Sequence, residues 1–499
     1  MLDLGPILKG QGTVAACVFA TAAIFAIVYW IIGGAVFPTD DAFINLHNAQ
    51  VIHEGHDENY IGVPALVGAT SGVHLALLLA IEKVVFSDTL ALYLLGAFCG
   101  VAYVLGLFLA CINVGCSRLE PMLIAVGGLI FAGTLFQLLN GMDTGLAMAA
   151  VAWNIKLLTD KRRTISLPLL CGIMPFIRPE LSLLSVGSML ILLLENGHSL
   201  RFKIAACATS LLSAVPFLMW YWVDTGSLVP STVGAKTYYF ADRYADWPDK
   251  LRFVSLATAR AAVACFPLFL CVRFIRPRSV GIVLAVFATI FIGSYLWKFP
   301  SGLSHNGSRY LYIFAPIILF GVACGLSSAA RTNTLRFVGI SALFLPLAFG
   351  GQLSDYWTHL TGNQKSLSDA VHWINENLPD RPTILVHDAG YVAYAGHVRL
   401  VDLVGLKTPA AIEFHKRLTY PSAGELRSKA IAEIARSFHP KYLLALQEWN
   451  EKFGLVDGLR EQGWVVEEVY TGKGQTNTPS PDIYHIYKLS EPITAARQS

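Results

Sequence analysis

The stretch Phe37–Ala49, FPTDDAFINLHNA, decides the fold class because it follows directly on the apolar run VAACVFATAAIFAIVYWIIGGAV at residues 14–36. Two adjacent carboxylates, Asp40 and Asp41, therefore stand where a hydrophobic helix leaves a membrane. The run is not followed by a small-residue cleavage site, so we expect a retained first span rather than a signal peptide. Acids at such a border either cap the start of a surface helix or act in catalysis, for example as a general base.

The composition of the whole chain indicates a membrane protein with many spans. Of the 499 residues, 54% are hydrophobic and 14% are charged, and the mean hydropathy is +0.53, whereas soluble proteins carry about 25% charged residues. The net charge of +3 is too small to indicate nucleic-acid binding. Nine cysteines lie in or beside apolar segments without the spacing of a metal site or a disulfide framework, so we interpret them as packing residues.

Basic clusters predict the orientation of the spans. The clusters are Arg118, Lys161-Arg162-Arg163, Arg201 with Lys203, Arg273 with Arg276 and Arg278, and Arg331 with Arg336. Two apolar segments separate each neighbouring pair of clusters, so all of them are expected on one face, which the positive-inside rule makes cytoplasmic. Segment 66–86 breaks this parity and is polar in its first half, so we predict an interfacial or re-entrant helix there. About eleven true spans remain.

Unusual polar residues collect on the opposite, outer face, in the stretches 36–65, 140–145, 176–180, 224–250 and 300–309. This one-sided pattern favours an enzyme that works at the outer surface of a membrane, because a transporter needs polar residues at mid-span. After Gly351 the composition changes, and half of the 34 acidic residues lie beyond it. We predict a transmembrane module at 1–351 and a soluble α/β domain on the outer face at 352–499.

The α/β prediction for the tail rests on alternating helix and strand patterns. The expected helices are SLSDAVHWINENL and ELRSKAIAEIARSF, and the expected strands are TILVHDAG, RLVDLVG, KYLLAL, WVVEEVY and YHIYKL.

Several outer-face residues are candidates for a site, each with a plainer alternative. Asp143 and Glu180 bind substrate or serve as helix caps and loop charges. Arg178 binds an anion or extends from the end of a span to the interface. Lys236 and Arg309 are cations on the face where cations are disfavoured, so we expect anionic partners: lipid head groups or a substrate phosphate. His305 is either a loop residue or a ligand.

The first outer loop begins with Asp40-Asp41-Ala42-Phe43-Ile44 and ends with Thr70-Ser71. With these residues it resembles the first outer loop of the GT-C superfamily, membrane glycosyltransferases that use polyprenyl-phosphate sugars, and most of all its arabinofuranosyltransferase branch. The matching residues, in order, are Asp40-Asp41-Ala42-Phe43-Ile44, Leu46-His47-Asn48-Ala49 in the place of an Arg-Tyr-Ala segment, and a Thr-Ser ending at Thr70-Ser71. Later steps resemble the superfamily at Asn140–Thr144, Arg178-Pro179-Glu180, Pro230-Ser231-Thr232 with Ala235-Lys236, Arg309-Tyr310 with Pro316, and His387–Leu406. The loop lacks the arginine and the glutamate of the usual pattern.

The resemblance implies the roles of individual residues. Asp40 is the expected catalytic base, and Asp41 supports it or binds a sugar or acceptor hydroxyl. Lys236, Arg309 and Arg178 are the expected ligands of the donor phosphate. Asp143, Glu180, Thr70, Ser71 and His305 are expected to bind substrate. A single displacement would invert the anomeric configuration, and no cofactor or metal is required, although a divalent cation stays open.

The resemblance also implies the partners and the location. The donor is a polyprenyl-phosphate sugar, with an arabinofuranose-like sugar favoured, and the acceptor is a glycan, lipid or protein of the cell envelope. The protein is expected in the bacterial inner membrane, with its site and tail on the periplasmic face. The tail either holds the acceptor or is a non-catalytic accessory domain. The alternative function is a transporter or flippase of a lipid-linked sugar, and a receptor that uses the tail does not account for the clustered motifs.

Overall fold

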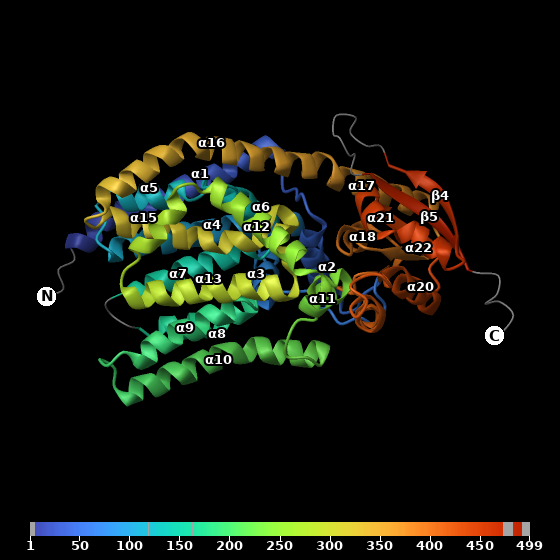
Figure 1. Ribbon diagram of the computed structural model, residues 1–499, viewed down its shortest axis with the longest axis horizontal. Coiled ribbons are helices and arrows are strands. Elements are labelled where there is room, and N and C mark those ends of the chain that lie inside the picture. The colour runs from blue at the N-terminus through green and yellow to red at the C-terminus, as the bar shows by residue number, and fades with distance from the viewer. Residues whose placement is uncertain (1–4, 118, 161–163, 473–482, 492–499) are drawn as a thin grey trace.

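The computed structural model describes residues 5–117, 119–160, 164–472 and 483–491. A bundle of helices forms one end of the molecule and a mixed sheet with its own helices forms the other, as Figure 1 shows. The helix α16 (Arg331–Thr361) runs along the bundle and leads into the second part. Two of the basic clusters used to predict the orientation, Arg118 and Lys161-Arg162-Arg163, lie outside the described residues.

The bundle consists of α16 and of the helices that come before it in the chain. Its other helices are α1 (Gly5–Ile32), α2 (Asp40–Glu54), α3 (Gly72–Glu82), α4 (Asp88–Asn113), α5 (Glu120–Gly127), α6 (Thr134–Leu139), α7 (Thr144–Thr159), α8 (Ser166–Ile177), α9 (Leu181–Leu194), α10 (Leu200–Thr225), α11 (Thr232–Phe240), α12 (Trp247–Ala264), α13 (Arg278–Lys298), α14 (His305–Ser308) and α15 (Ala315–Leu326). Short 3-10 turns lie at Asp242–Tyr244, Leu268–Phe274, Pro300–Ser304 and Arg309–Phe314.

The predicted count of about eleven spans is not confirmed. Within the described residues, six helical segments are long and apolar enough to cross a membrane, or seven if α12 and the turn after it, which meet at 90°, form one broken span. The apolar stretch 121–139 forms two short helices, α5 and α6, and α8 and α9 have 12 and 14 residues. The helix α3 has 11 residues, about half the length that a span needs, in keeping with the prediction of a non-spanning segment there. The bundle is a membrane domain.

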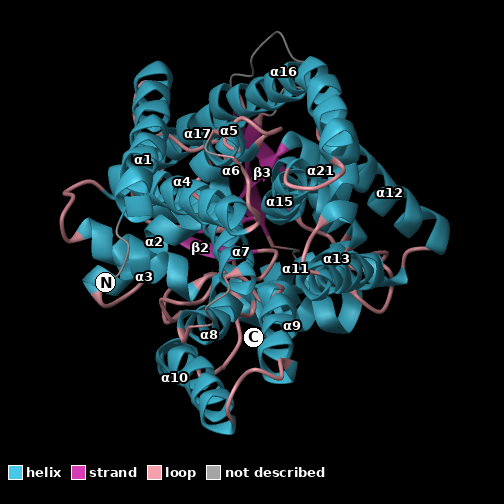
Figure 2. Ribbon diagram, turned by 90° about the vertical axis from the view of Figure 1, so that its left-hand side faces the viewer, coloured by secondary structure: helices cyan, strands magenta, loops and turns pink. Residues whose placement is uncertain are grey.

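Close helix packing in the bundle depends on glycine. A Cβ at Gly106 of α4 would lie 2.9 Å from the side chain of Trp153 in α7, and a Cβ at Gly172 of α8 would lie 2.0 Å from the carbonyl oxygen of Ser210 in α10. Small residues allow helices to approach where no hydrophobic effect drives their association in lipid. Figure 2 shows the result end-on, with the helices gathered around α4, α7 and α15.

The tail domain, which we define as residues 363–490, has the α/β fold predicted from the sequence. Its helices are α17 (Asn363–Asn377), α18 (Tyr391–Ala395), α19 (Pro409–Phe414), a π-helical turn at His415–Thr419, α20 (Arg427–Phe438), α21 (Gln447–Phe453) and α22 (Leu455–Glu461). Its strands are β1 (Thr383–Val386), β2 (Arg399–Asp402), β3 (Tyr442–Leu446), β4 (Val465–Thr471) and β5 (Tyr484–Ser490). The sheet order is β2-β1-β3-β5-β4, with β1, β2 and β3 parallel and β5 antiparallel to both β3 and β4.

Alternation of side chains along the strands builds two apolar layers. Ile384 and Val386 of β1 pack with α17 on one face of the sheet, whereas Leu385 packs with α20 on the other. The parallel strands are buried on both faces, which explains their near-continuous apolar sequences. The predicted domain boundary at residues 351 and 352 falls inside α16, which continues to Thr361.

Candidate active site

A cavity of about 380 Å³ lies between the bundle and the tail domain. Its bundle side is formed by the start of α2, by α6, by α11, by residues 304–307 and by the end of α16. Its tail side is formed by α17, by the segment after β1 and by residues at the ends of β3 and β5. Asp40, Asp41, Lys236 and His305 all line this cavity. The predicted acid pair therefore meets residues of both domains there.

Asp40 begins helix α2, but its carboxylate binds the tail domain rather than its own helix. Its Oδ2 accepts a hydrogen bond from the backbone N–H of Gly390 at 2.8 Å, and its Oδ1 accepts one from the N–H of Tyr391 at 2.6 Å. These N–H groups stand at the start of α18, where a helix has no internal acceptors for them. Asp40 is thus not a simple cap of α2; it holds the tail against the bundle.

The surroundings of Asp40 raise its pKa. Loss of water around the carboxylate raises the pKa of Asp40 well above its ordinary value, and the negative charge of Asp388 raises it further. The two backbone N–H bonds lower this pKa, and Asp41 adds a smaller rise. A carboxylate whose pKa is raised is a more effective proton acceptor near neutral pH.

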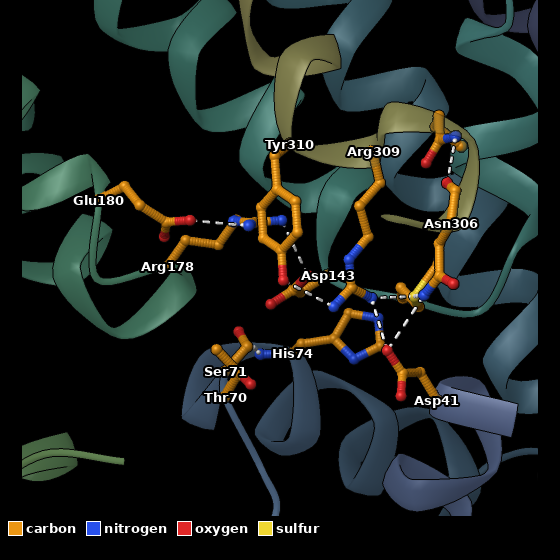
Figure 3. A network of polar contacts seen from close by, with 12 residues as sticks. Asp41, Thr70, Ser71, His74, Asp143, Arg178, Glu180, Asn306, Arg309 and Tyr310 are labelled. Atoms are coloured by element: carbon orange, nitrogen blue, oxygen red, sulfur yellow. Dashed lines mark hydrogen bonds and ion pairs between the residues drawn. The ribbon is translucent and has the colours of Figure 1, made fainter. Parts of the chain in front are cut away.

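Asp41 has the opposite environment. Its Oδ2 lies 3.1 Å from Nη1 of Arg309 and 3.4 Å from Nζ of Lys236, and it accepts a hydrogen bond from the amide of Asn306 at 3.1 Å. Figure 3 shows Arg309 and Asn306 converging on this carboxylate. Burial alone would raise the pKa of Asp41, but Lys236 and Arg309 together hold it well below its usual range. Asp41 therefore stays ionised and anchors two cations.

Asp41, Lys236 and Arg309 form an ion cluster. A second, smaller cavity of about 40 Å³ adjoins this ion cluster. The two cavities share the wall residues Asp41, Met142, Lys236 and Leu406, so the cluster separates them. The other residues that line the smaller cavity are Ile44, Asn45, Gly68, Thr70, Ser71, Asp143, Thr232 and Arg309. Lys236 thus borders both spaces, whereas Arg309 borders the smaller one, whose other lining residues all belong to the bundle side except Leu406.

Thr70 and Ser71, predicted to bind substrate, have structural partners as well. The hydroxyl of Thr70 donates to Oγ1 of Thr232 at 3.2 Å. The hydroxyl of Ser71 caps α3 by accepting the N–H of His74 at 3.1 Å, and it donates to the carbonyl of Phe176 at 3.2 Å. Of the two, Thr70 keeps more freedom to meet a ligand in the smaller cavity.

Arg178 lies in a buried network beside the site. Its guanidinium is 3% exposed and lies 3.4 Å from Asp143 and 2.8 Å from Glu180, which also accepts a hydrogen bond from the hydroxyl of Tyr295. Arg178 therefore does not extend to the surface, and neither Arg178 nor Glu180 lines either cavity. Figure 3 shows this pair on the far side of Tyr310 from Asp41.

Tyr310 connects the Arg178 network to the ion cluster. The guanidinium of Arg178 lies 4.6 Å from the centre of the Tyr310 ring, and that of Arg309 lies 4.9 Å from it. Arg309 also donates to the Tyr310 hydroxyl at 3.1 Å and contacts the sulfur of Met142. Arg178 thereby supports the position of Arg309.

The segment His305–Ser308 shapes the cavity wall. The ring of His305 packs against those of Phe240 and Phe299, at centroid distances of 5.0 and 5.2 Å. Asn306 and Ser308 have φ angles of 48° and 60°, in the left-handed region that side chains rarely adopt. Such strain is found at functional sites, and here it aims the Asn306 amide at Asp41.

Sequence reasoning did not assign roles to several residues of the site: Met142, Asn306, His387, Asp388, Trp449 and Tyr484. The Asn-Gly pair at 306 and 307 is a turn signal, and His387 and Asp388 stand in the segment that resembles the superfamily. Within the described parts of the chain, no group of three or more His, Cys, Asp or Glu side chains could hold a metal ion.

Replacing Gly390 with alanine is expected to lower activity about tenfold by displacing the tail from Asp40. A Cβ at this position would lie 2.2 Å from the carbonyl oxygen of Asp40 and 2.9 Å from the nitrogen of Ile44. Both atoms are backbone, so the two segments must separate. Faster hydrogen exchange at residues 390–395 checks this displacement, and Gly197→Ala, with nothing within 4 Å, is the control. Unchanged exchange in Gly390→Ala would contradict the contact.

Comparisons with known proteins identify the fold. A profile described as "Domain of unknown function (DUF8728)" matches residues 355–487. The comparison with curated proteins gives no match.

Three solved structures resemble nearly the whole chain. The arabinofuranosyltransferase AftD from mycobacteria superimposes with a TM-score of 0.51 at 16% identity, over 95% of this chain and 40% of that one. The oligosaccharyltransferase of Archaeoglobus fulgidus gives 0.53 at 13% identity, over 97% and 74% of the two chains. ArnT from Cupriavidus metallidurans, solved with undecaprenyl phosphate, gives 0.52 at 14% identity, over 94% and 97%. The chain thus spans 40% of the length of AftD. It has the GT-C fold, which confirms the fold class predicted from the sequence.

Proposed function

We propose that this protein is a glycosyltransferase that moves a sugar from a polyprenyl-phosphate donor to a hydroxyl of a cell-envelope glycan, lipid or protein. The reaction is placed at the outer face of the bacterial inner membrane, and an arabinofuranose-like sugar is favoured. The observation that carries the proposal is the convergence of Lys236 and Arg309 on Asp41, next to Asp40, at the border of a cavity. Transfer of a sugar from a lipid phosphate needs a carboxylate that accepts the proton of the acceptor hydroxyl and cations that stabilise the leaving phosphate.

The structural neighbours support this class of reaction and donor. One is named an arabinofuranosyltransferase, one an oligosaccharyltransferase, and ArnT was solved with undecaprenyl phosphate. Their likeness at this level concerns the fold, so the proposal depends on the residues of this chain.

The proposed reaction is one displacement at the anomeric carbon. An acceptor oxygen attacks from the side opposite the phosphate, and the new C–O bond forms as the bond to the phosphate oxygen breaks. The electron pair of the broken bond stays on the phosphate. The acceptor proton moves to Asp40, which later releases it to water. The anomeric configuration is inverted, and no further reactant is needed.

Lys236 and Arg309 are the proposed ligands of the donor phosphate. They come from α11 and from the turn Arg309–Phe314, and both reach Asp41 at the wall between the cavities. A phosphate oxygen that enters this wall replaces Asp41 as their partner, and fixed cations then stabilise the charge of the leaving group. Arg178, the third predicted ligand, is already paired, so we assign it a supporting role.

Lys236→Ala is expected to weaken binding of undecaprenyl phosphate about 10- to 100-fold, the effect of losing a hydrogen bond to a charged group. Arg309 remains on Asp41 in this variant, so the fold should persist. Arg309→Lys keeps the charge but loses the planar fork and should also bind more weakly. Binding is measured in detergent by isothermal calorimetry, with undecaprenol as the uncharged analogue. The exposed Arg252 provides the control Arg252→Ala. Equal affinity of all variants for the phosphate would show that these cations are not its ligands.

The orientation can be measured independently. Ser437 of α20 and Asn196 of the loop between α9 and α10 are both exposed. In Figure 1 this loop lies at the end of the bundle away from the tail domain. Ser437→Cys is expected to react with an impermeant thiol reagent on spheroplasts, and Asn196→Cys only after lysis. The reverse pattern would put the tail and the cavity on the cytoplasmic face and end the proposal of an outer-face enzyme.

The alternative function, movement of a lipid-linked sugar across the membrane, predicts a different result. A flippase would translocate a fluorescent polyprenyl-phosphate sugar in proteoliposomes without forming a glycoside. The enzyme would form an inverted glycoside, detected by mass spectrometry, with no net translocation. The site favours the enzyme because its acid pair and cations all lie at one end of the bundle, beside the tail domain.

A further inference from the structure

The tail domain places a second carboxylate in the cavity that contains Asp40. Asp388 follows β1 and lines the cavity with Asp40, His387 and Tyr484. Its Oδ2 accepts a hydrogen bond from the Tyr484 hydroxyl and lies 3.3 Å from Nδ1 of His387. The side chain is 23% exposed, so it is held from the tail side while its remaining acceptor positions are open to the cavity.

His387 gives this arrangement a fixed donor. Its Nε2 accepts the backbone N–H of Leu446 at 2.9 Å, so the neutral ring carries its proton on Nδ1. The side chain is fully buried and its ring stacks on Trp449, with centroids 4.4 Å apart and planes 6° apart. Nδ1 has no hydrogen-bond partner of good geometry. A buried donor of this kind, in a cavity wall, needs a polar partner to offset its lost hydration.

The rest of the cavity wall has the chemistry of a site for neutral hydroxyl groups. Amide side chains line it at Gln137, Asn140, Asn306, Gln352, Asn363 and Gln364, and carboxylates line it at Asp40, Asp41, Asp355 and Asp388. Among the described residues of this wall, Lys236 is the single Lys or Arg, and it is paired with Asp41. An anionic group near Asp388 would therefore be repelled, whereas hydroxyl groups can both donate to carboxylates and accept from amides.

We propose that the tail side of this cavity is the acceptor subsite and takes a neutral carbohydrate, with Asp388 accepting a hydrogen bond from a hydroxyl of the acceptor sugar. The inference rests on the proposed function, and it narrows the acceptor from glycan, lipid or protein to a glycan. Asp388 is then an acceptor-binding residue, positioned by the hydrogen bond from the Tyr484 hydroxyl. The attacking hydroxyl lies on the Asp40 side of the cavity, and the donor phosphate lies at Lys236 and Arg309. The tail domain thus forms part of the active site.

The experiment measures two affinities of the full-length protein in detergent. One probe is undecaprenyl phosphate, and the other is a panel of neutral arabinan, galactan and glucan oligosaccharides with their phosphorylated counterparts. Asp388→Asn preserves size and can still accept from Tyr484, and it should weaken binding of the neutral oligosaccharide about 10- to 100-fold while leaving the lipid-phosphate affinity unchanged. In transfer assays the same variant should raise KM for the acceptor more than it lowers kcat. Asp380→Asn, an exposed acid of the tail, is the control.

The two proposals fail in different ways. If undecaprenyl phosphate binds through Lys236 but Asp388→Asn binds every oligosaccharide as tightly as the wild type, the subsite is wrong and the proposed function stands. If phosphorylated oligosaccharides bind more tightly than neutral ones, the assigned acceptor class is wrong. If neutral oligosaccharides bind through Asp388 while the wild type does not bind undecaprenyl phosphate, the donor and the proposed reaction are overturned and the carbohydrate site remains. Tyr484→Phe tests the support of Asp388 and should give a smaller loss in the same direction.

Discussion

Replacing Asp40 with asparagine is expected to reduce sugar transfer by about 10²–10⁴, the usual contribution of a general base. Asparagine has the size of aspartate but cannot take the acceptor proton. Binding of undecaprenyl phosphate should persist, because Lys236 and Arg309 keep their contacts with Asp41. The measurement is kcat for transfer by the purified variant, beside its affinity for the lipid phosphate.

The contact between Asp40 and the tail requires a matched control. Both carboxylate oxygens accept backbone N–H groups, so the asparagine variant loses one of the two bonds to Gly390 and Tyr391. Gly390→Ala disturbs the same contact but keeps the carboxylate. If both variants lose activity equally, Asp40 acts only by holding the tail. A base requires a far larger loss in Asp40→Asn.

The pH dependence provides a second, independent readout of Asp40. A base acts when deprotonated, so activity is lost as the pH falls through its pKa, which burial and Asp388 raise. The acid limb of kcat/KM should therefore lie well above pH 4, near which an unperturbed aspartate titrates. Asp388→Asn removes a negative neighbour, lowers this pKa and should move the limb to lower pH. If the acid limb stays at the same pH in Asp388→Asn, the charge of Asp388 does not influence the pKa of Asp40.

The fold could be predicted where local pattern determines it. The five strands and the helices α17 and α20 follow from alternation and from periodic apolar residues, and tertiary packing agrees with both. The spans were less predictable. Hydropathy does not reveal where an apolar helix is interrupted, as between α5 and α6. Inside the bundle, neighbouring groups can form hydrogen bonds with the backbone N–H and C=O groups that such a break leaves free.

The candidate site was predictable in its residue types but not in its pairings. Asp41 and Lys236 were both singled out as outer-face charges, and they meet although 195 positions separate them. Which anion each cation takes depends on tertiary geometry, so Arg178 could not be told apart from Arg309 in the sequence. The contact of Asp40 with Gly390 bridges 350 positions through backbone N–H groups, which every residue except proline carries. The role of the tail could therefore only emerge from the structure.

The tail is held in place by a buried charge, and this leads to the second large expected effect. Lys407 is fully buried, and its Nζ donates to Oδ1 of Asn48 at 2.8 Å and lies 3.6 Å from Oδ2 of Asp57. Asp57 is also fully buried at its side chain, and its Oδ1 accepts the N–H groups of Asn59 and Tyr60. The segment 48–57 thus binds the tail through one ion pair that is shielded from water.

Lys407→Met is expected to destabilise the docked tail by about 3–5 kcal/mol, because it leaves the charge of Asp57 buried without its cation. Hydrogen exchange at residues 400–404, which directly precede the contact at Lys407 in the tail, measures the opening free energy. Lys416→Met is the matched control, since Lys416 is exposed and pairs loosely with Glu413 at 3.8 Å, a surface contact worth at most about 1 kcal/mol.

Adding Asp57→Asn to Lys407→Met should restore much of the loss, because a neutral buried pair has no unpaired charge. Equal destabilisation by Lys407→Met and Lys416→Met would mean that water reaches Asp57. Since Asp388 enters the cavity from the tail, the undocked variant should also lose acceptor binding while it still binds undecaprenyl phosphate.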